Sequence, residues 1–186
     1  MISIVFAIGF AAAMTLLLLS LAGLLIPRFQ FWPPPERASW QHLVFWTLFR
    51  MMFASIVLLC MLDYQGIGSV ASLRAIAGWT MVLVGFGLAT FVTVKLGWED
   101  AHGEANQLRT DGWFSWSRNP IYVLSFVGMT GIVIAVNSWY VNCLLGLWAG
   151  MYMLAPYAEE PWLEKAFGDE YRDYVSKVPR FVGWVR

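Results

Sequence analysis

The sequence predicts an all-α integral membrane protein, and three observations support that prediction. Of the 186 residues, 59% are hydrophobic and only 13% are charged, whereas a soluble domain is typically about a quarter charged. About five apolar stretches recur along the chain, most of them near the roughly 20 residues that a helix needs to cross a bilayer. Polar segments and prolines separate these stretches. The length suits one membrane-embedded domain over residues 1–186.

Each apolar stretch is predicted to form one membrane-spanning helix. The first contains no charged residue and is followed by an aromatic, proline-rich run, Phe31–Pro35, which suits the headgroup layer. The third is rich in small residues, which allow close helix packing. We expect the spans at Ile2–Ile26, His42–Leu62, Leu73–Leu96, Ile121–Val136 and Trp139–Tyr157.

The last two spans are predicted to form a tight hairpin, because only Asn137-Ser138 separates them. After the hairpin, apolar residues recur every three or four positions, which indicates amphipathic helices. Gly168 interrupts this stripe, and Asp169 is predicted to cap the helix that follows. We therefore expect two short amphipathic helices on the cytosolic face. The stripe consists of Leu163, Phe167, Tyr171, Tyr174 and Val178.

Basic residues predict the orientation of the chain. They gather in the segments that follow the first, third and fifth spans, whereas Arg74 is the exception on the other side. Because basic segments stay in the cytosol, we expect the N-terminus outside and the C-terminus in the cytosol, in the cytoplasmic or an internal membrane. Arg50 and Asp63 are interpreted as interfacial, with the Arg50 side chain reaching towards the inner interface.

The composition also argues against two classes of partner. Lys+Arg and Asp+Glu both number 12, so no net charge attracts nucleic acid. Cys60 and Cys143 lie inside apolar runs and are interpreted as inert buried thiols. Together with His42 and His102, they lack the spacing of a metal site. We expect neither nucleic acid nor metal as a partner.

Two polar clusters flank the hairpin and are predicted to meet at one membrane face. One contains Arg118 and the other contains Glu159-Glu160. A cationic cofactor that carries an amino-acid group needs carboxylates for its positive end and an arginine for its own carboxylate. Its flat base needs a slot lined by small and apolar groups, which Gly85-Phe86-Gly87 supplies. The two clusters and this glycine pair together allow such a pocket.

Two sequence blocks resemble a known family. Leu108–Tyr122 is similar to the pattern T-x-G-x-[YF]-x-x-x-R-[HN]-P-x-Y of isoprenylcysteine carboxyl methyltransferases and phospholipid N-methyltransferases. Glu159–Tyr174 is similar to their second pattern, E-E-x-x-L-x-x-x-F-G-x-x-Y-x-x-Y. The resemblance covers roughly Gly78 to Phe181. Asn119 stands where the protein-methylating branch usually has histidine, which leaves the substrate open.

The resemblance implies S-adenosyl-L-methionine as the cofactor, bound in a cytosolic pocket. It divides the chain into two N-terminal spans, residues 1–70, and a methyltransferase-like core, residues 71–186. The expected catalytic residues are Arg118, Glu159 and Lys165, and the basic candidates for orienting an anionic acceptor are Arg172 and Arg180. The expected cofactor-binding residues are Gly85, Gly87, Leu108, Arg118, Asn119, Pro120, Tyr122, Glu159 and Glu160.

The implied activity is methyl transfer to a lipidic or membrane-partitioned acceptor that enters from the bilayer. An isoprenylcysteine carboxylate, a phospholipid amine or a similar group fits this description. Two alternatives stay open. One is an NADPH-dependent membrane reductase of the sterol reductase type, which has a related R-x-P-x-Y pattern. The other is a non-enzymatic membrane scaffold or transporter, although the sequence lacks the mid-membrane cluster of charges that transporters tend to have.

Overall fold

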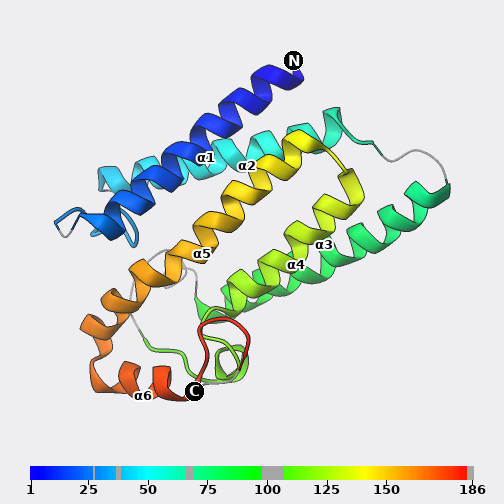
Figure 1. The fold of residues 1–186 in the computed structure, drawn as a ribbon. Helices are drawn as coiled ribbons and strands as arrows, with labels where there is room; N and C mark the ends of the chain where they lie inside the picture. The colour runs from blue at the N-terminus through cyan, green and yellow to red at the C-terminus, as the bar shows by residue number, and fades with distance from the viewer. Residues whose placement is uncertain (27, 37–38, 66–68, 98–106, 184–186) are drawn as a thin grey trace.

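The computed structural model describes residues 1–26, 28–36, 39–65, 69–97 and 107–183, and every regular element within them is helical (Figure 1). The predicted all-α class is therefore confirmed for these residues. His102 and most of the polar segment after the third span lie outside them. The elements are α1 (Ile2–Leu25), α2 (Trp40–Leu62), α3 (Ser69–Leu96), the 3-10 turn η2 (Gly112–Ser115), α4 (Pro120–Val136), α5 (Trp139–Phe167) and α6 (Asp169–Lys177).

Four helices are long and apolar enough to cross a membrane. They are α1, α2, the part of α3 from Ser72 to Leu96, and α5. Helix α4 is apolar but shorter, at 17 residues. These lengths and compositions agree with an integral membrane protein.

Polar residues define where several helices begin and end. The Ser39 hydroxyl accepts a hydrogen bond from the His42 amide at the start of α2, and the Ser138 hydroxyl accepts one from the Val141 amide at the start of α5. Such serine caps satisfy amides that lack a partner inside the helix. Asn137 ends α4 in the left-handed conformation, with φ of 56°, which asparagine adopts more readily than most residues. The connection from α4 to α5 consists of only two residues, Asn137 and Ser138.

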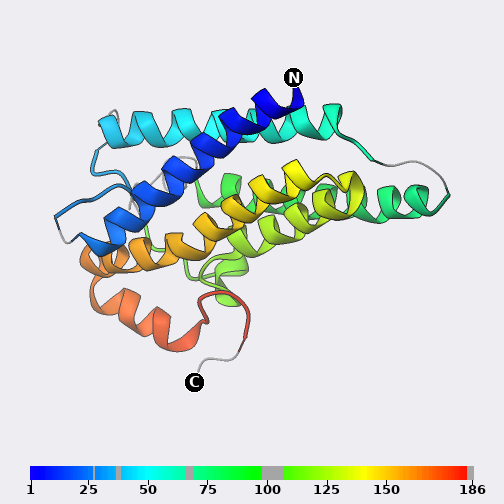
Figure 2. The same ribbon diagram turned by 45° about the horizontal axis from the view of Figure 1, so that its top comes forward.

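Helix α5 lies between two helix pairs. Helix α1 packs against α2, α3 packs along α4, and α5 contacts α1, α2 and α4 (Figures 1 and 2). A buried apolar stripe runs along α5 because residues three and four positions apart share one helix face. This stripe consists of Val141, Leu144, Leu145, Trp148 and Met151. It holds α5 at the centre of the bundle.

Glycines bring α3 and α4 into backbone contact. A Cβ atom added to Gly85 would lie 2.3 Å from the Gly128 nitrogen, and one added to Gly78 would lie 2.6 Å from the Ala135 nitrogen. Both neighbours are backbone atoms, which cannot rotate out of the way. The small residues therefore set the separation of this helix pair, as in many membrane helix contacts.

The structure corrects two predictions about the tail. Helix α5 does not end near Tyr157 but continues through Pro156 and Pro161 to Phe167, so the first predicted amphipathic helix is the end of α5. Each proline removes one backbone hydrogen bond, and the neighbouring bonds sustain the helix. The break at Gly168 is confirmed, with φ of 57°, but Gly168 itself is the capping residue of α6. Asp169 is instead paired with Arg172.

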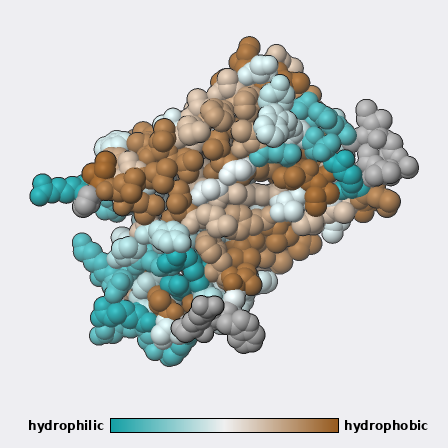
Figure 3. All heavy atoms as spheres, in the orientation of Figure 1, coloured by the Kyte–Doolittle hydropathy of each residue, from teal (hydrophilic) through white to brown (hydrophobic). Residues whose placement is uncertain are grey.

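Polar residues gather at one end of the bundle. Figure 3 shows hydrophilic residues over the lower left of the molecule, where Figure 1 places the end of α5 and helix α6, and apolar residues over much of the remaining helical surface. The start of α4 and the end of α3 lie at this same end. The chain therefore brings segments far apart in sequence to one polar end.

Gly85→Ala is expected to destabilise the protein. The new methyl group clashes with the backbone of Gly128, so we expect the free energy of unfolding to fall by about 1–3 kcal/mol. Gly87→Ala is the matched control, because a Cβ there meets nothing within 4 Å. Thermal unfolding in detergent measures both variants. Equal unfolding midpoints for the two variants would contradict the glycine-mediated contact.

Candidate functional site

A cavity of about 550 Å³ lies at the polar end of the bundle. Its wall combines the end of α3, the segment before α4, the C-terminal half of α5, and α2 with the segment that precedes it. This volume lies within the range of small-molecule sites. Residues from five parts of the wall illustrate the convergence: Trp32, Phe49, Leu96, Tyr122 and Glu159.

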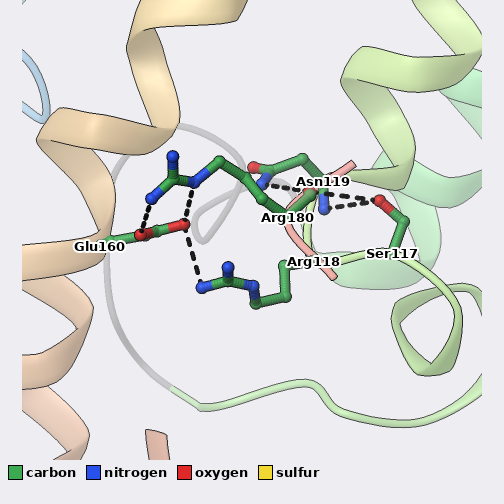
Figure 4. Close-up of polar contacts among 5 residues, drawn as sticks. All are labelled: Ser117, Arg118, Asn119, Glu160 and Arg180. Atoms are coloured by element: carbon green, nitrogen blue, oxygen red, sulfur yellow. Dashed lines mark hydrogen bonds and ion pairs between the residues drawn. The ribbon is translucent and has the colours of Figure 1, made fainter. Parts of the chain in front are cut away.

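Two arginines bind the carboxylate of Glu160 (Figure 4). Arg180 donates from Nε and Nη2 to the two carboxylate oxygens, each at 2.7 Å. Arg118 Nη1 lies 3.0 Å from Oε1 on the other side. The side chains of Arg118 and Glu160 are only 11% and 18% exposed, so solvent screens the pair weakly. Glu160 thereby connects α5 to the start of α4 and to the tail.

Backbone contacts reinforce this connection. The Arg118 amide donates to the Pro179 carbonyl at 2.9 Å, and the Asn119 side-chain amide donates to the Arg180 carbonyl at 2.9 Å. Ser117 is buried and its hydroxyl accepts a hydrogen bond from the Asn119 amide. The tail after α6 therefore runs directly beside residues 117–119 and fixes their backbone.

The surroundings of the tail residues keep each in one protonation state. Hydrogen bonds to Glu160 raise the pKa of Arg180 above its ordinary value, so its guanidinium stays charged. The guanidinium carbon also lies 4.0 Å from the centre of the Tyr157 ring, a cation–π geometry. Burial, aided by the charge of Glu160, raises the pKa of Tyr171 to about 12. Tyr171 is therefore a neutral phenol at physiological pH.

Glu159 has a different environment from Glu160. Its Oε1 accepts hydrogen bonds from the Tyr122 hydroxyl at 2.5 Å and from the Trp32 indole at 2.7 Å. No arginine is paired with Glu159 in the part of the chain that the structure describes. One glutamate is thus paired with two arginines, whereas its neighbour is bound by neutral donors and has no cation partner among the described residues.

Two arginines of the cavity wall keep donors without an acceptor. Nε and Nη1 of Arg118 and Nε of Arg109 are buried and make no hydrogen bond with described residues. The 3.0 Å approach of Arg118 Nη1 to Glu160 is an ion pair without hydrogen-bond alignment. Buried polar atoms without a partner are uncommon. Guanidinium donors of this kind suit an anionic group.

The structure brings most of the predicted site residues to this cavity. Seven of them line it: Leu108, Arg118, Asn119, Pro120, Tyr122, Glu159 and Glu160. Arg180 reaches it through Glu160.

Besides Arg180, four predicted residues do not line the cavity. Gly85 and Gly87 belong to α3, where Gly85 packs on α4. Lys165 is exposed on α5 and does not line the cavity. Arg172 is 58% exposed and pairs with Glu164 and Asp169 on the outer surface.

Sequence reasoning missed much of the cavity wall, including Trp32, Arg109 and Tyr152. Trp32 bonds to Glu159 from the segment between α1 and α2, where no motif pointed to a role. Arg109 lies beside Leu108 inside the first motif block, and its charge was an available signal. Tyr152 lies two turns before Glu159 on α5, and its ring centre is 4.5 Å from that of Tyr122.

Comparison with known proteins gives one match. Residues 73–170, more than half of the chain, match the model of the family described as phospholipid methyltransferase. Searches of curated proteins and of solved structures gave no match. The matched segment begins in α3 and ends in α6, so it contains both glutamates, Arg118 and Tyr122.

Glu160→Gln is expected to loosen the tail. The variant leaves Arg118 and Arg180 without their shared carboxylate, so we expect the free energy of unfolding to fall by about 1–3 kcal/mol and proteases to cut the tail faster. Glu164→Gln is the matched control one turn later, because Glu164 pairs with an exposed arginine. Limited proteolysis and thermal unfolding report both effects. Similar behaviour of the two variants would contradict the role of Glu160.

Proposed function

The chain belongs to the phospholipid methyltransferase family, and we propose that it transfers a methyl group from S-adenosyl-L-methionine to a lipidic or membrane-partitioned acceptor. The match to this family makes it a membrane methyltransferase in the broad sense. One observation best supports this cofactor: the cavity wall contains both a carboxylate and guanidinium donors that lack a hydrogen-bond partner among the described residues. Glu159 offers a carboxylate, and Arg118 and Arg109 offer unused donors.

This arrangement suits the amino-acid end of the cofactor. Its ammonium group matches the carboxylate of Glu159, and its carboxylate matches the free donors of Arg118 and Arg109. Tyr122 and Trp32 hold Glu159 in place by bonding to one of its oxygens. Asn119 and Pro120 lie between Arg118 and Tyr122 and set their spacing at the start of α4. The wall therefore fits a ligand that carries both charges of an amino acid.

When bound, the cofactor supplies a methyl group on a positively charged sulfur, and an acceptor lone pair displaces the neutral thioether. The protein contributes positioning and exclusion of water. The ion pairs of Glu160 with Arg118 and Arg180 hold this part of the cavity wall in place. A carboxylate acceptor attacks without losing a proton, whereas an ammonium acceptor must first release one.

We further propose a membrane arrangement with five crossings, in which α4 crosses as the short fourth span. The two-residue connection between α4 and α5 returns the chain to the same side. The N-terminus is then outside, and α6 lies in the cytosol with the polar end of the bundle. Basic residues at that end support the orientation, because basic segments remain cytosolic.

Cysteine labelling tests this orientation. In a variant with Cys60 and Cys143 changed to serine, Gln65→Cys at the end of α2 is expected to react with an impermeant maleimide in intact cells. Lys177→Cys on α6 is expected to react only after the membrane is opened. Both positions are exposed. Labelling of Lys177→Cys in intact cells would contradict the proposed orientation.

Ligand binding tests the cofactor assignment. We expect S-adenosylhomocysteine, and not NADPH, to raise the unfolding temperature of the purified protein. Glu159→Gln is expected to weaken binding of S-adenosylhomocysteine by about 10- to 100-fold in calorimetry, because a charge-assisted hydrogen bond to the ammonium is lost. Tyr122→Phe, which frees Glu159 on one side, is expected to weaken it less. Stabilisation by NADPH alone would instead favour a reductase, and unchanged binding by Glu159→Gln would contradict the site.

A further inference from the structure

Arg50 lies in the middle of an otherwise uncharged helix. Helix α2 contains no other Lys, Arg, Asp or Glu. Arg50 follows the first residue of α2 by ten positions, which is about 15 Å along the helix axis. An ionised side chain at such a depth is costly in a bilayer and usually faces a partner or a functional cavity. The surroundings of Arg50 therefore indicate its role.

Arg50 lines the cavity, and the part of the chain that the structure describes offers it no partner. Its side chain is exposed and contributes to the cavity wall. Within the described residues it makes no ion pair or hydrogen bond. Glu160 is already bound by two arginines, and Glu159 faces Tyr122 and Trp32. The α2 side of the cavity thus presents a positive charge without a counter-charge.

The helix face around Arg50 is aromatic. Four aromatic residues of α2 line the same cavity: Phe45, Trp46, Phe49 and Phe53. The rings of Phe49 and Phe53 pack edge-on against Trp148, with centroid distances of 5.6 Å and 6.0 Å. Such a surface suits a hydrocarbon chain, and the guanidinium suits an anionic group. A ligand that has both a hydrocarbon chain and an anionic group matches this wall.

Arg50 and Glu159 lie at different depths of the cavity. The ring of Phe45 stacks on Trp32 at 4.2 Å, and Trp32 bonds to Glu159, so Phe45 lies near the level of Glu159. Arg50 follows Phe45 by five positions, about 7.5 Å further along α2. The backbone of Arg50 therefore lies deeper along α2 than the level of Phe45, and Arg50 and Glu159 line the cavity from different helices.

Helices α2 and α3 both contribute residues to the cavity wall. Helix α2 contacts α1 and α5, but the described residues form no extensive contact between α2 and α3. The cavity wall includes Arg50 on α2 and Thr93 and Leu96 near the end of α3. The cavity wall at Arg50 is thus shared by two helices that, among the described residues, pack little against each other.

We propose that Arg50 binds the anionic group of the methyl acceptor while the aromatic face of α2 contacts its hydrocarbon chain. The acceptor is then an anionic amphiphile whose phosphate or carboxylate pairs with the guanidinium. This inference rests on the proposed function and adds a specificity-determining residue to it. Arg50 lies before residue 73, outside the segment that matches the family. The first two helices therefore select the acceptor, whereas the matched segment binds the cofactor.

Binding to purified protein in a neutral detergent tests the inference. The probes are short-chain phosphatidylethanolamine, a zwitterion with an anionic phosphate, N-acetyl-S-farnesylcysteine, with an anionic carboxylate and no amine, and monoacylglycerol, which has no charge. The first two each carry one anionic group and are called the anionic probes. We expect Arg50→Gln to weaken binding of the anionic probe by about 10- to 100-fold and to leave monoacylglycerol binding unchanged. Arg50→Lys is expected to retain most of the affinity. The anionic probe that wild type binds more tightly shows whether the acceptor's anionic group is a phosphate or a carboxylate.

Lys95→Gln is the matched control, because Lys95 is an exposed basic residue at the end of α3 that does not line the cavity. It should bind every probe as wild type does. Calorimetry with S-adenosylhomocysteine is performed on the same samples, and its affinity should not change in Arg50→Gln.

Unchanged binding of both anionic probes by Arg50→Gln overturns the inference, and so does an equal loss of the uncharged probe. If S-adenosylhomocysteine binds wild type but Arg50→Gln binds the anionic probes as tightly as wild type does, only the proposed role of Arg50 is wrong. If S-adenosylhomocysteine does not bind wild type, the proposed function fails and the acceptor role fails with it.

Discussion

The ion pairs of Glu160 are the contacts on which the candidate site depends. Glu160 lies on α5, Arg118 lies just before the start of α4, and Arg180 lies in the tail after α6. A charge buried at this depth is stable only when it is paired, so the three segments must stay together. The cavity keeps its shape because α4, α5 and the tail meet at this one carboxylate.

This pairing also separates the roles of two adjacent acids. Arg118 and Arg180 pair with Glu160, whereas Glu159 is bound, among the described residues, by the neutral donors of Tyr122 and Trp32. Adjacent residues on a helix point about 100° apart, which lets them reach different neighbours. The same short motif thus supplies both a structural ion pair and a carboxylate for the proposed cofactor.

Sequence reasoning predicted the parts of the structure that follow from local patterns. Apolar runs located the helices, and the Arg118 and Glu159-Glu160 motifs located two walls of the cavity. It did not predict that α5 continues through Pro156 and Pro161, because helix continuation past proline depends on neighbouring bonds and packing. It also missed Trp32, whose contact with Glu159 joins residues 127 positions apart. Gly85 illustrates the same limit, since its motif suggested a ligand while its backbone packs against Gly128.

Photochemical cross-linking with labelled S-adenosylmethionine tests the central claim most directly, namely that the cofactor lies between the start of α4 and the C-terminal half of α5. Irradiation of the bound complex, followed by peptide mapping, is predicted to label aromatic residues of the cavity, above all Tyr122 and Tyr152. Excess S-adenosylhomocysteine should abolish the labelling. Competable labelling confined to peptides that contribute nothing to the cavity wall, such as the first half of α1, would contradict the account.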